Sequence, residues 1–97
     1  MARIEIIELN FTATAVDKLW GHGLRPGQVL FVLNRHWVAA RNRTDRAATY
    51  LLIGHDDQGR CLTMPIAPTD DPLVWRVITG WYCKRSEAAK LRYKEAR

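Results

Sequence analysis

Residues 50–66 have the pattern of a β-hairpin, and this pattern limits the fold more than any other part of the chain. Residues 50–54 (YLLIG) form a short apolar run that is typical of a strand. The DDQG sequence at residues 56–59 favours a turn, with its glycine placed for a positive φ angle. Residues 60–66 then return antiparallel, although Pro65 lacks a backbone N–H and favours a sheet edge or a bulge. An antiparallel sheet is therefore expected.

The N-terminal part of the chain predicts one strand and two helices. Residues 3–9 are apolar and β-branched, as in a strand. Residues 12–23 predict a helix that Thr12 or Thr14 caps and a glycine ends. Pro26 suits the first turn of a second helix. The apolar faces of the two helices would hold Val16, Leu19 and Trp20 in the first and Val29, Leu30, Val32 and Leu33 in the second.

The C-terminal part predicts a long strand and a last helix, after a connection at residues 35–46 that is partly strand-like. Residues 73–82 alternate, with Val74, Arg76, Ile78 and Gly80 on one face and Leu73, Trp75, Val77, Thr79 and Trp81 on the other. Ser86 would cap the last helix, with Glu87 in its first turn. The order β-α-α-β-β-β-α predicts a single α+β domain over residues 1–97. It would have a small antiparallel sheet of about four strands with helices packed on one face.

The charge is basic and concentrated in two segments. The chain has 15 Lys and Arg against 10 Asp and Glu. Most of these cations are arginine, whose planar guanidinium binds phosphate with two hydrogen bonds and stacks on bases. The basic segments are residues 35–46, with Arg41 and Arg43, and residues 84–97. An anionic partner such as a nucleic acid is indicated, although a solvated helix face would also explain the C-terminal segment.

The cysteines and histidines favour no metal site or cofactor. Cys61 and Cys83 are spaced unlike zinc ligands, and the three histidines are scattered. Two buried free thiols are the expected state in a reducing compartment, with a disulfide or a metal site as the alternative. No apolar run approaches the roughly 18 residues of a membrane span, and residues 1–10 lack the apolar core of a signal peptide. A cytoplasmic location without membrane attachment is expected.

Three segments resemble the BrnT family of bacterial type II toxins, which have the ribonuclease fold of the RelE group. The first is the His22-Gly23-Leu24 sequence at the end of the predicted helix, followed by another apolar helix. The second is the hairpin at residues 50–66, and the third is WRVITGWYCKRSEAAKLRY at residues 75–93. The resemblance covers most of the chain beyond residue 10.

The resemblance implies a metal-independent endoribonuclease that cleaves RNA and inhibits translation. A ribbon-helix-helix antitoxin would inhibit it. The toxin would form a homodimer or a hetero-oligomer with that antitoxin. In such folds RNA lies on the open sheet face, and cations stabilise the charge that develops on phosphorus when the 2′-hydroxyl attacks. The matching residues are Arg60 after the turn glycine and Arg76 in the last strand, with His22 in the HG element. Lys84 and Arg85 match the start of the basic helix.

The chain also departs from the family pattern. Members commonly read R-I-I-S-A-R in the last strand, where this chain has Trp81 in place of the second arginine. Gly21 stands where a lysine usually precedes HG. One guanidinium fewer weakens phosphate stabilisation. The alternative function is therefore a non-catalytic BrnT-like module that binds nucleic acid or protein, and an assembly protein with tryptophans at its interface is a third hypothesis.

Arg60 and Arg76 are the first candidates for catalysis. On neighbouring antiparallel strands, they could converge on one phosphate. The alternative is that each forms a structural salt bridge with Asp56, Asp70 or Asp71.

His55 is the third catalytic candidate, since an imidazole titrates in the range that suits proton transfer. A turn histidine without a role is its alternative, and for His22 the alternative is a helix cap. Tyr50 and Trp81 could stack on bases, with a core or interface position as the alternative. Nucleic-acid binding is also expected at Lys84, Arg85, Arg41 and Arg43.

Overall fold

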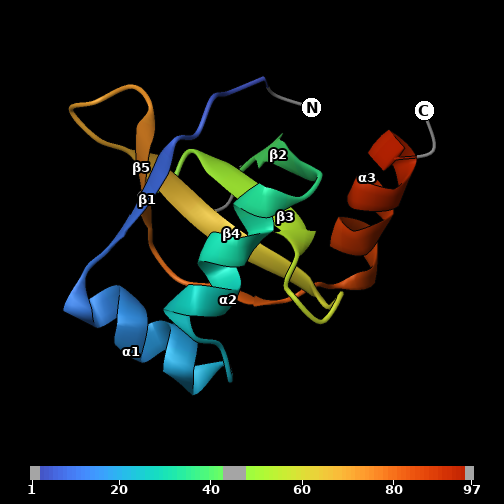
Figure 1. The fold of residues 1–97 in the computed structure, drawn as a ribbon, viewed down its shortest axis with the longest axis horizontal. Coiled ribbons are helices and arrows are strands. Elements are labelled where there is room, and N and C mark those ends of the chain that lie inside the picture. Colours follow the sequence, from blue (N-terminus) through green and yellow to red (C-terminus); the bar gives the residue numbers. More distant parts are fainter. Residues whose placement is uncertain (1–2, 43–47, 96–97) are drawn as a thin grey trace.

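In the computed structural model, which describes residues 3–42 and 48–95, a mixed sheet carries helices on both faces (Figure 1). The elements are β1 (Glu8–Phe11), α1 (Ala13–Gly21), α2 (Pro26–Phe31), the 3-10 turn η1 (Val32–Asn34), β2 (Trp37–Arg41), β3 (Tyr50–His55), β4 (Cys61–Pro68), β5 (Val74–Val77), β6 (Trp81–Tyr82) and α3 (Arg85–Glu95). No helix within these ranges is long and apolar enough to cross a membrane. The expected α+β class is confirmed.

The sheet has six strands in the described residues, in the order β1-β5-β4-β3-β2, with β6 also paired to β4. The pairs along β2, β3, β4 and β5 are antiparallel, as the hairpin pattern predicts. β1 runs parallel to β5, with Asn10 beside Arg76. The expected sheet of about four strands, all antiparallel, was therefore wrong in the number of strands and in the direction of β1. The parallel pairing of β1 with β5 joins residues far apart in sequence and leaves no local signal.

A bulge divides the predicted strand at residues 73–82 into β5 and β6. Ile66 pairs with Val77, and Leu62 pairs with Tyr82. The two β4 residues are four positions apart and their partners are five positions apart, so the partner segment contains one extra residue. Pro65 lies opposite the break, and its carbonyl accepts from Ile78 N–H at 3.0 Å. In an antiparallel strand the N–H of a residue points the same way as its carbonyl, so the missing N–H of proline faces the break. Pro65 therefore lies at a bulge and in a central strand, so of the two positions expected for it the bulge is confirmed and the sheet edge is not.

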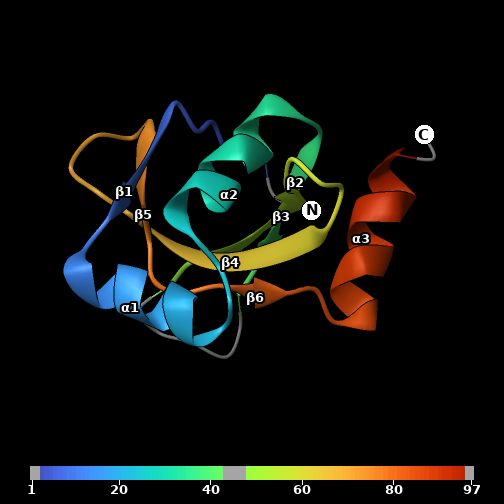
Figure 2. The same cartoon turned by 60° about the horizontal axis from the view of Figure 1, so that its bottom comes forward.

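The two faces of the sheet bury two different cores. On one face, α1 and α2 cover the main cluster, which contains Leu9, Leu19, Leu24, Val29, Val32, Leu52, Leu62, Met64, Ile66, Trp75 and Val77. On the other face, Leu91 of α3 packs against Val38, Ala40 and Ile53. α3 thus lies apart from α1, next to β2 and β3 (Figure 2). The expectation of helices on one face was wrong, because consecutive apolar residues at 51–53 bury both sides of β3.

The starts of α1 and α2 follow local sequence signals. α3 instead begins at Arg85, so Ser86 lies inside the helix and the expected Ser86 cap was wrong. Thr12 caps α1, since its Oγ1 accepts from Ala15 N–H at 3.1 Å. Gly23 follows α1 with φ +78°, a conformation that favours glycine. Pro26 is the first residue of α2, as expected. Trp20, predicted on the apolar face of α1, is instead 56% exposed.

We expect the close approach of η1 to β3 to make Gly54 intolerant of a side chain. A Cβ at Gly54 would overlap Val32 Cγ1 and lie 3.2 Å from Trp37 Cβ. Gly54→Ala should therefore lower the free energy of unfolding by about 1–3 kcal/mol, as overpacking does. Gly27→Ala in α2 is the control, because its Cβ meets nothing within 4 Å and alanine favours helix. Equal urea midpoints for wild type and Gly54→Ala would contradict this packing.

Candidate nucleic-acid interface

Three cation–aromatic pairs gather where the α1–α2 connection, the β3–β4 turn and β6 meet. The guanidinium carbon of Arg25 lies 5.5 Å from the Trp20 ring centroid, and that of Arg60 lies 5.4 Å from Tyr82. Lys84 Nζ lies 5.7 Å from the Trp81 ring centroid. We call this region the aromatic–cationic surface, and it consists of Trp20, His22, Arg25, Arg60, Trp81, Tyr82 and Lys84.

Contacts between the α1–α2 connection and β6 join these pairs into one surface. The Tyr82 hydroxyl donates to the Gly23 carbonyl at 3.4 Å. The His22 ring meets the Trp81 ring edge-on, with centroids 6.5 Å apart. Trp20 and Tyr82 are 56% and 39% exposed, which is unusual for such large rings. Aromatic area is thus left open to solvent beside Arg25 and Arg60.

A buried carboxylate holds the turn that carries Arg60. Asp56 Oδ1 accepts from the backbone N–H groups of Gln58 and Arg60 at 2.9 and 2.8 Å. Its Oδ2 accepts from Gln28 Nε2 at 3.1 Å and from Arg60 Nε at 2.9 Å. Gln28 Oε1 in turn accepts from Arg25 N–H at 2.9 Å, which links the start of α2 to the turn. One carboxylate therefore connects two of the three cation-bearing segments.

The same hydrogen bonds keep Asp56 ionised although it is fully buried. Burial is the largest single influence and raises the pKa of Asp56. Hydrogen bonds from Arg60, Gln28 and Gln58 together outweigh it, so the pKa falls below its ordinary 3.8. The carboxylate is thus negatively charged at neutral pH and holds the Arg60 guanidinium beside it.

Arg60 and Arg76 do not come together. Arg60 is bonded to Asp56, one of the salt bridges that the sequence allowed, and its side chain remains 45% exposed. Arg76 pairs with Ala67, seven residues beyond Arg60, or about 23 Å along β4 at about 3.3 Å per residue. Arg76 is exposed on the face opposite Trp75. One phosphate therefore cannot contact both guanidinium groups.

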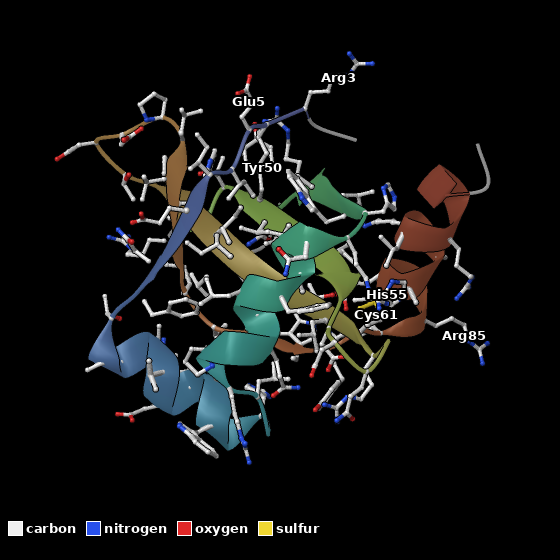
Figure 3. All side chains as sticks on the ribbon, viewed as in Figure 1. Arg3, Glu5, Tyr50, His55, Cys61 and Arg85 are labelled. Carbon is white, nitrogen blue, oxygen red and sulfur yellow. A yellow bond between two sulfur atoms is a disulfide. The ribbon has the colours of Figure 1, made fainter. Side chains whose placement is uncertain are left out.

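The other predicted aromatic and histidine candidates separate in the same way. Tyr50 meets Trp75 edge-on, with centroids 5.6 Å apart, and packs against the main core. His55 ends β3 opposite Cys61, near the turn, whereas Tyr50 lies at the far end of this strand (Figure 3). Trp81 belongs to the aromatic–cationic surface, and Tyr50 does not.

The predicted cations beyond the hairpin take different positions. Lys84 lies over Trp81, next to the first residue of α3. Arg85 is that first residue, and its side chain points away from the sheet (Figure 3). Arg41 is exposed at the end of β2, beside Tyr50, and Arg43 lies outside the described residues.

Glu87 holds the α3 side of the surface, a role that its position in the first helical turn did not predict. Its side chain is buried, and Oε1 accepts from Trp81 Nε1 at 3.0 Å and from Lys84 N–H at 2.8 Å. Thr63 Oγ1 donates to the same oxygen at 3.1 Å. Three donors thus orient Glu87, and it orients Trp81 and Lys84.

The two cysteines form a disulfide, so the expected free thiols are wrong and the disulfide alternative is confirmed. Cys61 Sγ and Cys83 Sγ are 2.04 Å apart, and the bond joins β4 to the residue that follows β6. Within the described part of the chain, no group of three or more His, Cys, Asp or Glu side chains could hold a metal ion.

Sequence reasoning missed three residues of this surface, Trp20, Arg25 and Tyr82, and also Gln28, which supports it. Trp20 appeared to belong to a helix face, and Arg25 and Gln28 had no motif around them. Tyr82 appeared only as the end of a strand. The available signal was the crowding of tryptophan, histidine and arginine at residues 20–25, directly at a helix end.

No family model matches the chain, and no curated protein matches it at a significant level. The chemistry of the aromatic–cationic surface is therefore inferred from the contacts within this chain.

We expect Asp56→Asn to destabilise the protein by about 2–3 kcal/mol at pH 7, because hydrogen bonds to a charged group are lost in the interior. The effect should depend on pH. The folded pKa lies below the unfolded value, so the contribution of the carboxylate is complete above about pH 5 and is lost as the pH falls through the folded pKa. Urea unfolding at pH 7, 5 and 3 measures this difference.

Asp57→Asn, at the exposed neighbouring position, is the matched control and should change stability little. A gap between wild type and Asp56→Asn that stays constant from pH 7 to pH 3 would contradict the ionised, buried carboxylate.

Proposed function

We propose that this chain binds single-stranded RNA at the aromatic–cationic surface and acts as a metal-independent endoribonuclease toxin of the BrnT type. The observation that carries this proposal is the pairing of two exposed rings, Trp20 and Tyr82, with the guanidinium groups of Arg25 and Arg60. Rings of this kind stack on unpaired bases, and guanidinium groups bind the phosphates between them.

The physical chemistry of the surface favours a single strand over a duplex. Stacking on a tryptophan or tyrosine needs an unpaired base, since the bases of a duplex are already stacked. The formal net charge of +5 adds attraction to the RNA backbone at long range. The ring and the cation of each pair would contact successive parts of one nucleotide.

For cleavage, we propose Arg60 as the group that stabilises charge on the phosphate and His55 as the proton carrier. The two residues flank the β3–β4 turn, since His55 ends β3 and Arg60 precedes β4. Asp56 orients the guanidinium of Arg60 through its Nε, which leaves the rest of that group for a phosphate. Arg76 stands too far along β4 to act on the same phosphate and would contact RNA elsewhere.

The biological setting of the proposal follows the family resemblance. The protein would act in the cytoplasm, and a ribbon-helix-helix antitoxin would inhibit it by covering the aromatic–cationic surface. The toxin would be a homodimer or part of a hetero-oligomer with that antitoxin.

A second candidate is a BrnT-like module that binds RNA without cleaving it. Two observations favour it: Trp81 stands where the family has an arginine, and Arg60 and Arg76 lie about 23 Å apart at about 3.3 Å per residue. Cleavage would then lack the second guanidinium, while the rings would still stack on bases.

RNA binding should depend on the two exposed rings. We expect Trp20→Ala and Tyr82→Ala each to weaken binding to a labelled single-stranded RNA about 5- to 100-fold, the cost of one lost stacking contact. Fluorescence anisotropy measures the affinity, and a comparison of two salt concentrations gives the electrostatic part of the binding free energy. Ile7→Ala is the control, because Ile7 is also a large exposed side chain but precedes β1. Equal affinity of all three variants would place the RNA elsewhere.

The two functions differ in the response of cleavage to arginine substitution. For a ribonuclease, we expect Arg60→Lys to reduce RNA cleavage and growth arrest on the order of 100-fold, because lysine cannot reproduce the donor geometry. Lysine keeps a positive charge beside Asp56, which limits the effect on folding. Arg76→Ala should retain cleavage within about twofold, because Arg76 lies outside the site.

Each other outcome has a definite meaning. Wild-type protein that binds RNA and leaves it intact is the non-catalytic module. Loss of cleavage in Arg76→Ala with full cleavage in Arg60→Lys would move the site to the opposite face of the sheet.

A further inference from the structure

The disulfide lies inside the chain segments that carry the aromatic–cationic surface. Cys61 directly follows Arg60, and Cys83 stands between Tyr82 and Lys84. Cys83 N–H also donates to the Cys61 carbonyl at 2.9 Å. The bond joins residues 22 positions apart. A change at this sulfur pair therefore acts directly on the relative position of Arg60, Tyr82 and Lys84.

The ladder that sets the register of β6 is short, and single hydrogen bonds from Trp81 to Glu87, from Tyr82 to Gly23 and from Cys83 N–H to the Cys61 carbonyl support it. β6 has two residues and pairs with β4 through Tyr82 opposite Leu62 and Trp81 opposite Thr63. The bulge at residues 78–80 separates this pairing from the longer ladder of β5. Exposed cation–aromatic contacts add only about 0.5–1 kcal/mol each. A covalent bond at this point consequently has a large share in keeping the surface assembled.

The sulfur atoms are placed where thiol chemistry can occur. Both cysteines are half-buried, unlike the fully buried neighbours Leu62 and Met64. Thr63 Oγ1 lies 3.3 Å from Cys83 Sγ, and this hydroxyl also donates to Glu87. A polar partner is therefore already present for a thiol at Cys83, and it connects that sulfur to the carboxylate that orients Trp81 and Lys84.

We propose that Cys61 and Cys83 form a reversible dithiol–disulfide site that accepts small dithiol reductants, and that its oxidised state assembles the RNA-binding surface. The regulatory part rests on the proposed function. In the cytoplasm where we place this protein, disulfides are rare, and those that occur are usually transient and redox-sensing.

In this thiol–disulfide exchange, the dithiol reductant supplies the electrons and protons that the protein gains. One thiolate of a dithiol attacks a sulfur of the pair, the S–S bond breaks, and a mixed disulfide forms while the other cysteine leaves as a thiolate. The second thiol of the reductant then displaces the remaining cysteine. The products are two protein thiols and the cyclic disulfide of the reductant, so two electrons and two protons pass to the protein.

Reduction should act locally. It removes the covalent tie between Cys83 and Cys61. Tyr82 is then held near Arg60 by the short pairing of β6, by the backbone bond from Cys83 to Cys61 and by the hydrogen bonds of Tyr82 and Trp81. The β3–β4 ladder includes Cys61 only at its end, opposite His55, and its other five pairs, from Tyr50–Ile66 to Gly54–Leu62, keep their own register and the main core. The cation–aromatic pairs then separate more often, and a bound RNA would lose its fixed contacts.

The experiment compares the oxidised chain of residues 1–97, the same chain in dithiothreitol, and the Cys61→Ser/Cys83→Ser double variant. Hydrogen exchange is measured by mass spectrometry over residues 81–87 and over β3. We expect exchange at residues 81–87 to rise at least about tenfold on reduction, as in a local opening, with β3 unchanged. The double variant should match the reduced wild type and should not respond to dithiothreitol.

RNA affinity is measured on the same three samples. We expect the reduced and double-variant proteins to bind single-stranded RNA about tenfold more weakly than the oxidised protein, the cost of roughly one stacking contact. If the oxidised protein does not bind RNA, the proposed function fails, and hydrogen exchange still decides whether the sulfur pair controls the surface. Equal exchange in the oxidised and reduced states would overturn the inference. An equal rise of hydrogen exchange in β3 would also overturn it, because the disulfide would then stabilise the whole fold and not the surface alone.

Discussion

The buried, ionised carboxylate of Asp56 is the interaction on which the rest of this structure depends. It accepts four hydrogen bonds, from the turn backbone, from Gln28 of α2 and from Arg60. These bonds close the β3–β4 hairpin in a single register, and every other strand is added to that hairpin directly or through β5. A buried charge without partners would be strongly unfavourable, so the turn, the start of α2 and Arg60 must stay together in the folded state.

A second buried carboxylate, that of Glu87, connects separate elements on the α3 side in the same way. Glu87 accepts from Trp81, Thr63 and Lys84, and it thereby joins the start of α3 to β6 and β4. These two acids support parts of the aromatic–cationic surface from the interior: Asp56 holds the Arg60 guanidinium, and Glu87 holds the Trp81 ring and the backbone of Lys84. Such support reduces the freedom that a binding surface must lose when a ligand orders it. The disulfide adds a covalent tie between β4 and the residue after β6, and the proposed redox control of the surface depends on this tie.

Local signals in the sequence were sufficient for most of the elements. The turn at residues 56–59, the Thr12 cap, Gly23 and Pro26 act within a few residues of themselves, and each appears where its pattern indicates. Pairing between distant segments was not predictable in this way. The parallel contact of β1 with β5, the placement of α3 on the second face and the extra residue of the bulge depend on packing across the whole chain. The bulge had the largest consequence, because it moved Trp81 and Tyr82 out of the alternation that residues 73–77 begin.

By itself, the sequence determined an α+β chain with a central hairpin, a basic balance and an arginine at the end of the turn. It also indicated an anionic partner, because composition and local charge do not depend on tertiary contacts. Only the tertiary structure decided which cations and rings share a surface. Arg60 and Arg76 seemed to be neighbours on adjacent strands, but the register sets them far apart along β4. Trp20 and Arg25 have no local link to the hairpin, but Gly23, which lies between them in the sequence, bonds to Tyr82, and Arg25 lies over Trp20. The physical reason is that register and helix docking are set by burial of the two cores, and those depend on all strands at once.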